Sequence, residues 1–149
     1  MDYIKINDSI SLGEPTLDDI DNLVKYLNNK EIYNNTLSIP YPYTKQDGEW
    51  FVNFVGDKKT EFGETLNWSI REKQGNLIGG IGFQNGINKQ KAKIGYWLAK
   101  PYWGKSIMKI VVGKVYDIGF NKFGLKRITA TIFEHNVASA KWWKNVALY

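Results

Sequence analysis

The stretch that decides the fold is Leu98–Phe120, LAKPYWGKSIMKIVVGKVYDIGF, in which an apolar segment passes through a Gly-Lys-Ser turn into a long helical pattern. Apolar side chains recur at the spacing of helical turns, namely Ile107, Val111, Val115 and Ile118. Gly124 follows as the residue at which this helix is expected to end. The first amides of such a helix are orphan donors at the positive end of its dipole, so the turn before it favours an anion.

Strand patterns surround this turn. Alternation and β-branched content predict a short strand at Ile10–Pro15 and longer ones at Leu66–Glu72, Asn76–Gln84 and Lys91–Lys100. A further strand is predicted at Leu125–Phe133, after the helix. The three longer strands are joined by short hairpin-type turns and should form an antiparallel meander. The helix should then cross over from the last strand of the meander to the strand that follows.

Helical patterns occupy the first third of the chain. Thr16 and Asp19 form a capping pattern for a first helix. Its apolar face is expected to hold Leu17, Ile20, Val24 and Leu27. An aromatic loop with two prolines, Thr36–Thr44, leads to a second helix at 45–57. With a last helix capped by Asn136, the order of elements predicts a single α/β or α+β domain over residues 1–149.

Composition narrows the class of protein. With 149 residues and 43% hydrophobic content the chain can fill one core, and it shows neither an apolar run of membrane length nor a signal-peptide pattern. We therefore expect a soluble, cytoplasmic protein without membrane contact. The chain has no cysteine and a single histidine, His135, so we expect no metal site. A net charge of +5 favours anionic partners without identifying one, because the basic residues are scattered.

The Gly-Lys-Ser turn has more than one interpretation. Ala99–Ser106, AKPYWGKS, matches the phosphate-binding loop of nucleotide triphosphatases except at its first position, where Ala99 replaces a glycine. Pro101 also removes an amide that such a loop uses, and an antiparallel meander is the wrong context for it. The alternatives are a capped helix start that binds nothing and a helix start that holds the phosphates of another cofactor. In the second case Gly104 would allow close approach and Lys105 would add charge.

Two segments resemble a known family. IGYWLAKPYWGKSIM (Ile94–Met108) and FGLKRITATIFEHNVAS (Phe123–Ser139) are similar to the acetyl-CoA-dependent N-acetyltransferases of the GNAT superfamily, in particular to ribosomal-protein N-terminal acetyltransferases. The resemblance runs from about Ile10 to Ser139. It implies a largely antiparallel sheet flanked by helices, with acetyl-CoA as cofactor. The implied reaction is acetyl transfer to a primary amine, either a protein N-terminus or a small molecule.

The resemblance also assigns cofactor contacts. They fall on Leu98, Ala99, Trp103, Gly104, Lys105, Ser106, Ile107 and Asn136. Of these, Trp103–Ile107 would hold the pyrophosphate of the coenzyme, while the backbone of Leu98 and Ala99 would bind its pantetheine arm. The acceptor side of the cleft would be shaped by the segments WSIRE, IGGIGF and IPYPYT, which are residues 68–72, 78–83 and 39–44.

Catalytic candidates follow from what acetylation of an amine needs. Backbone amides near Leu98 would polarise the thioester carbonyl. Ser139 or Tyr96 is a candidate proton donor to sulfur, and Glu134, acting through water, is a candidate base. For Glu134 we favour the simpler interpretation of an exposed carboxylate at a strand end.

The sequence departs from the family pattern in four places. Gly13 stands where arginine is common, Lys93 where an acidic residue is common, and Ser106 where the turn has a second small glycine. After the Asn-x-x-Ser motif the family continues into two further strands, whereas this sequence closes with AKWWKNVALY. We therefore expect a sheet that lacks its last two strands, and a homodimer formed through the exposed edge.

Three functions stay open on this evidence. The first is an N-acetyltransferase, and the second is a homologue that binds coenzyme A but is catalytically impaired. The third is a basic nucleic-acid-binding module, which is the weakest because the chain lacks the aromatic and basic motif of RNA-recognition domains.

Overall fold

The structure is a computed structural model that describes residues 3–36 and 39–130. One sheet holds six strands in the order β1-β2-β3-β4-β5-β6. Their bounds are β1 Tyr3–Lys5, β2 Ser11–Gly13, β3 Asn67–Arg71, β4 Leu77–Asn88, β5 Lys91–Leu98 and β6 Arg127–Ala130. Neighbouring strands are antiparallel except β5 and β6, which are parallel. The predicted α+β fold, with an antiparallel meander and one crossover, is therefore confirmed.

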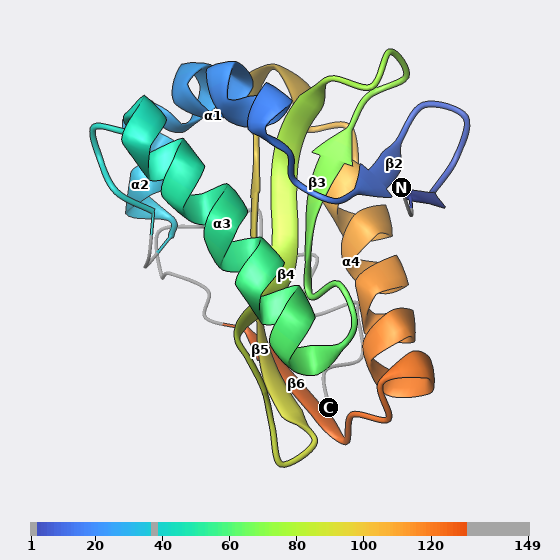
Figure 1. The fold of residues 1–149 in the computed structure, drawn as a ribbon. Coiled ribbons are helices and arrows are strands. Elements are labelled where there is room, and N and C mark those ends of the chain that lie inside the picture. Colours follow the sequence, from blue (N-terminus) through green and yellow to red (C-terminus); the bar gives the residue numbers. More distant parts are fainter. Residues whose placement is uncertain (1–2, 37–38, 131–149) are drawn as a thin grey trace.

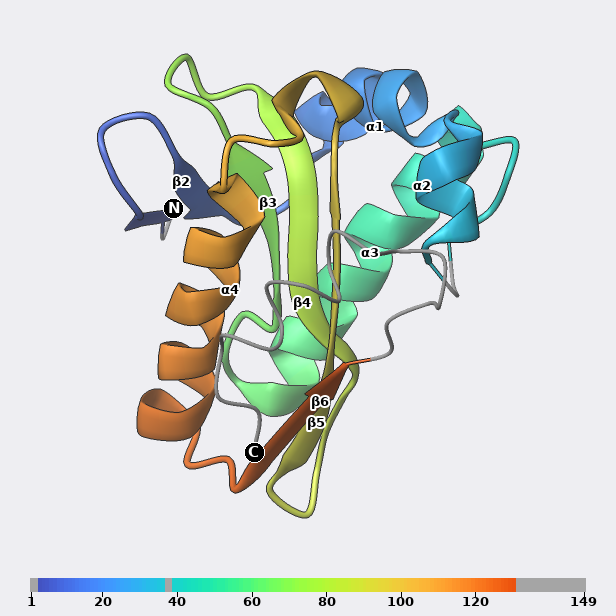
Figure 2. The ribbon, with the colours of Figure 1, turned by 180° about the vertical axis from the view of Figure 1, so that it is seen from behind.

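Helices cover both faces of the sheet (Figures 1 and 2). One face carries α1 Ile20–Leu27, α2 Lys30–Asn34 and α3 Lys45–Phe62, and the other carries α4 Ile107–Asp117. Short 3-10 turns precede α1 and α4, and a π-helical turn follows α4; they are η1 Leu17–Asp19, η2 Lys100–Tyr102 and η3 Ile118–Lys122. Within the described ranges, none of the helices combines the length and the apolar character needed to span a bilayer.

The core has two parts, one on each side of the sheet. The larger part packs α4 against the strands and includes Val111 and Val115, which are fully buried as the helical pattern predicts. The smaller part lies under α1 and α2, with Leu23 and Leu27 at its centre. Leu17 does not belong to this smaller core, since its side chain is 62% exposed. The chain at Leu17 forms the 3-10 turn η1, and Leu23 of α1 is buried instead. The predicted apolar face of the first helix was wrong at that position.

Further differences from the predicted elements concern the length of β4 and the presence of α2. β4 continues to Asn88 instead of ending at Gln84, because a register shift between these two residues absorbs the Asn-Gly pair. The hairpin turn falls at Lys89 and Gln90, whose φ angles are 53° and 64°. The helix α2 was not predicted, and its amides are capped by the side chain of Asn29. The predicted end of the last strand and the helix after Asn136 lie outside the described residues.

One buried ion pair joins the helical layer to β3. The two terminal nitrogens of Arg71 donate to the two carboxylate oxygens of Asp19 at 2.7 and 2.8 Å, and Asp19 is only 5% exposed. Asp19 also accepts from the amide of Thr16 at 2.9 Å, as the capping pattern predicts. Gly13 makes room for this arrangement, since a Cβ there would lie 3.0 Å from Nε of Arg71. The glycine that departs from the family pattern therefore accommodates Arg71.

Removal of Arg71 tests how much this ion pair contributes to the free energy of unfolding. Arg71→Ala leaves the buried carboxylate of Asp19 without its cation, so we expect the free energy of unfolding to fall by about 3–5 kcal/mol. Urea denaturation followed by circular dichroism measures the loss. The double variant with Asp19→Asn should recover part of it, because it no longer buries an unpaired charge; a loss below about 1 kcal/mol in Arg71→Ala would contradict the assignment.

Gly79 in β4 gives a second test. A Cβ on Gly79 would lie 2.6 Å from the carbonyl oxygen of Trp97, a backbone atom that cannot move aside. Gly79→Ala should therefore destabilise the protein by at least about 1–3 kcal/mol, through overpacking. Gly56→Ala in α3 is the matched control, because nothing lies within 4 Å of its Cβ and helix propensity predicts a gain of about 1 kcal/mol. Thermal melting of both variants should show shifts of opposite sign.

Candidate functional site

A cleft of about 1380 Å³ lies between the α1–α3 layer and the start of α4. This volume exceeds the roughly 300–1,000 Å³ that is usual for a site holding one drug-sized ligand. Its walls come from α2, the 39–43 loop and α3 on one side, from the middle of β4 and the end of β5, and from the turn that leads into α4. The cleft therefore offers room for an extended cofactor together with a second molecule.

The turn at the start of α4 brings the predicted phosphate-binding residues to this cleft. All of Trp103–Ile107 line it. Gly104 has a φ of 77° and open space where a side chain would be, so its backbone is accessible to a ligand. Ser106 is the N-cap residue of α4, with φ 60° and ψ 16°, and its side chain makes no capping hydrogen bond. The first amides of α4 are thus not capped by Ser106, and Lys105 stands exposed beside them.

The end of β5 contributes backbone groups to the same cleft. The amide of Ala99 donates to the carbonyl of Ile78 in β4 at 2.8 Å. Because hydrogen-bonding directions alternate along an antiparallel pair, the N–H and C=O of Leu98 point away from β4. The carbonyl of Leu98 accepts from Nε1 of Trp103 at 2.7 Å, which ties the turn back to the strand. The described part of β6 pairs with β5 only as far as Ile94.

The remaining predicted residues fall into three groups. Tyr96 lines the cleft, whereas Ala99 is fully buried and does not. Glu134, Asn136 and Ser139 lie outside the described residues. Of the three segments predicted to shape the acceptor side, IGGIGF and IPYPYT contribute lining residues, but residues 68–72 contribute none. In that segment the side chains of Trp68 and Ile70 are buried in the larger core instead.

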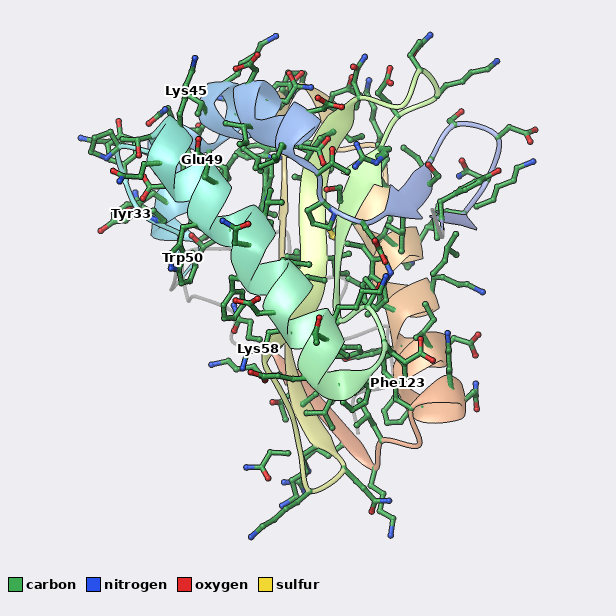
Figure 3. The ribbon with its side chains drawn as sticks, in the orientation of Figure 1. Tyr33, Lys45, Glu49, Trp50, Lys58 and Phe123 are labelled. Carbon is green, nitrogen blue, oxygen red and sulfur yellow. The ribbon has the colours of Figure 1, made fainter. Side chains whose placement is uncertain are left out.

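Sequence reasoning missed the wall formed by α2 and α3. Four aromatic side chains form what we call the aromatic mouth, namely Tyr33, Tyr41, Trp50 and Phe54. Trp50 belongs to the helical spacing of aromatic and apolar residues in the second helix, yet it is 65% exposed. The ring of Trp50 stacks on that of Phe54, four residues on, with centroids 5.1 Å apart. This helical spacing does not distinguish an aromatic pair in the core from one at a cleft, so the sequence held no signal for it. Figure 3 shows Tyr33 and Trp50 on the same side of the molecule.

Carboxylates accompany these rings. Glu31 and Asp47 line the cleft at this end, whereas Lys105 and Lys109 line it at the start of α4. Burial, and secondarily the negative charge of Asp47, raise the pKa of Tyr43 to about 12. The Tyr43 hydroxyl therefore keeps its proton at neutral pH. The charged lining residues are thus carboxylates at one end of the cleft and lysines at the other.

Comparison with known proteins identifies the fold. The sequence profile of the family described as "Acetyltransferase (GNAT) domain" matches residues 10–146. The chain is 30% identical over 135 residues to the "Uncharacterized N-acetyltransferase p20" of Bacillus licheniformis, an alignment that covers 89% of this chain and 74% of that one.

Solved structures of acetyltransferases share this fold. The microcin C7 self-immunity acetyltransferase MccE, in complex with acetyl-CoA and AMP, superposes with a TM-score of 0.76 at 24% identity, over 93% of this chain and 77% of that one. The ribosomal L7/L12 alpha-N-protein acetyltransferase RimL, in complex with coenzyme A, gives 0.82 at 18% identity, over 97% and 82%. The spermidine N-acetyltransferase of Vibrio cholerae, in complex with CoA and spermine, gives 0.75 at 19% identity, over 93% and 80%.

At these identities the structures establish the fold alone, and the family match carries the assignment. The predicted resemblance, a mixed and largely antiparallel sheet with flanking helices, is confirmed. The chain belongs to the GNAT acetyltransferase family.

Proposed function

We propose that this protein binds acetyl-CoA in the cleft and acetylates a primary amine, on a small molecule or a protein N-terminus. The observation that carries the proposal is that the uncapped start of α4, the accessible backbone of Gly104 and the end of β5 all meet in one cleft. When bound, acetyl-CoA supplies the acetyl group: its thioester C–S bond breaks as the amine nitrogen gains the acyl carbon, and the proton that the nitrogen loses leaves with the thiol.

The residues of the turn fit a pyrophosphate. The first amides of α4 and the positive end of its dipole attract an anion, and the absence of a side chain on Gly104 lets phosphate oxygens reach the backbone. Lys105 adds a positive charge that no carboxylate lining this end of the cleft opposes, within the described residues. We therefore assign Gly104–Ile107 to the diphosphate of the cofactor, with Trp103 holding the turn in place.

The end of β5 fits the acyl-bearing arm. The amide of Leu98 points away from β4, where it would hydrogen-bond the pantetheine arm or orient the acetyl carbonyl. The bond from Trp103 to the carbonyl of Leu98 keeps the strand end and the phosphate turn in one fixed relation. Such positioning supplies a large share of the acceleration in reactions between two bound partners.

Tyr96 is the described residue that we assign to proton transfer. Tyr96 is among the residues that line the cleft, two residues before Leu98, where its hydroxyl oxygen would hold a proton for the departing sulfur. Ser139 as an alternative donor, Glu134 as a base acting through water, and Asn136 as a cofactor contact stay predictions that rest on the family resemblance.

Calorimetric titration with acetyl-CoA tests the cofactor site. We expect binding in the micromolar range, weakened about 5- to 10-fold by Lys105→Ala, because a charge-assisted contact to a phosphate is worth roughly 1.5–3 kcal/mol before screening by salt. Lys91→Ala, at the far end of β5, is the matched control and should bind normally. No heat with acetyl-CoA, together with tight binding of an RNA oligonucleotide, would favour the nucleic-acid alternative. Binding without thiol release on addition of amines would favour the impaired homologue.

Ser106 offers a test of the turn itself. Its positive φ places a side chain in the left-handed region, which costs about 1–2 kcal/mol for residues other than glycine. Ser106→Gly relieves that strain, although glycine loses up to about 1 kcal/mol of chain entropy, whereas Ser106→Ala keeps the strain and loses the hydroxyl. We expect the glycine variant to melt higher than the alanine variant, by roughly 1 kcal/mol in unfolding free energy. Equal melting of the two would show that the turn does not hold this conformation.

A further inference from the structure

The aromatic mouth is exposed in a way that packing does not explain. Trp50 is 65% exposed, Tyr33 44% and Tyr41 41%. Phe54 covers one face of the Trp50 ring, in a stack only 13° from parallel, and the exposure of Trp50 leaves its other face to solvent. Tyr33 and Tyr41 form a second, tilted pair with centroids 5.5 Å apart. Large apolar side chains that gather in the open beside a cleft mark a binding surface.

The charged residues beside the aromatic mouth bear on whether the ligand there is a cation or an anion. Glu31 and Asp47 line the cleft beside the aromatic rings, and none of the described lining residues on α1–α3 or the 39–43 loop is a lysine or arginine. Glu31 is held at the rim by Lys100 at 2.8 Å, and Asp47 accepts from the amide of Thr44 at 2.8 Å. The charged residues that line this wall are thus carboxylates, with two ammonium groups close by, that of Lys100 on Glu31 and that of Lys58 beside Phe54. A cationic ligand would meet carboxylates and aromatic faces together.

The protein itself places an ammonium on this row of rings. Nζ of Lys58 lies 5.7 Å from the centroid of Phe54, one helical turn beyond it on α3. Trp50, Phe54 and Lys58 follow one another at four-residue intervals on α3, and Nζ of Lys58 also pairs with Glu61 at 3.2 Å. Indole is the strongest of the aromatic side chains as a partner for a cation.

We propose that the acceptor is a small amine that carries a second positive charge, such as a linear diamine. Trp50 and the neighbouring carboxylates hold the second charge while the first amine, in its neutral form, is acetylated. This inference rests on the proposed function and specifies its acceptor. Trp50 is then a specificity-determining residue and takes no part in proton transfer.

Matched acceptors test the proposal. The kcat/KM for acetylation of a linear diamine is compared with that of the monoamine of the same chain length, in the wild type and in Trp50→Leu. We expect the diamine to be favoured about 10-fold, which corresponds to about 1.4 kcal/mol. In Trp50→Leu the preference should shrink by about 3- to 10-fold, the range of a cation–aromatic contact. Tyr3→Leu removes an equally exposed aromatic side chain on β1, 68% exposed, and should leave the preference intact.

The outcomes separate this inference from the function on which it rests. Equal rates for diamine and monoamine, an unchanged preference in Trp50→Leu, or a better rate with a peptide N-terminus or an amine-bearing nucleotide would overturn it, while bound acetyl-CoA and released thiol would still support the acetyltransferase. A second readout needs no turnover. Diamine titrated into the protein saturated with coenzyme A should bind, and Trp50→Leu should weaken that binding about 3- to 10-fold; no heat in the wild type overturns the inference.

Discussion

The helical wall of the cleft depends on the buried ion pair between Asp19 and Arg71. Two charges almost removed from water stabilise a fold only when they are fully paired, and here each carboxylate oxygen meets a guanidinium nitrogen. Asp19 begins the helical layer and Arg71 ends β3, so the pair fixes where that layer sits on the sheet. The same guanidinium donates to the carbonyl of Glu14, which secures the chain between β2 and η1.

The helices α1 and α3 then pack closely at that anchor. Gly48, in the first turn of α3, faces Ile20 so closely that a Cβ would lie 3.1 Å from it. Further along, the carboxylate of Glu14 accepts from Thr65 and pairs with Lys59 of α3. These contacts orient α3 across the sheet, and its outer side carries Trp50 and Phe54 to the cleft. The aromatic wall is thus a consequence of how the helical layer is attached.

The sequence predicted most reliably those elements whose signal is local. The spacing of Val111 and Val115 defined the face of α4, and Thr16 with Asp19 marked the start of the helical layer. The hairpin turn lies at Lys89 and Gln90, and β4 reaches Asn88 beyond its predicted end at Gln84, because an irregular pairing of β4 with β5 between Gln84 and Asn88 has no local signal in the sequence. A short helix such as α2 has too few residues to show a period, so its only local sign was the capping residue Asn29.

The candidate site also has one part with a local sequence signal and one part without. The turn before α4 is built from consecutive residues, 103–107, and so it was visible in the sequence. The opposite wall brings Tyr33, Tyr41 and Trp50 together from three separate segments, and no spacing rule relates them. Nor does sequence distinguish an aromatic residue that faces the core from one that faces a ligand, because both occur at helical intervals. Only the position of α3 over the sheet decided that Trp50 faces outward.

The ion pair between Glu31 and Lys100 connects the two halves of the cleft. Glu31 belongs to the wall that holds the aromatic rings, and Lys100 lies four residues before Gly104, so a single contact joins the two halves of the cleft. A molecule that draws Glu31 toward itself releases Lys100, and a molecule that displaces Lys100 frees Glu31. Where a ligand in one half breaks this ion pair, thermodynamic linkage requires that it and a ligand in the other half change each other's affinity by the same factor. Both side chains are more than half exposed, so the ion pair is weak and the change in affinity that it could transmit is small.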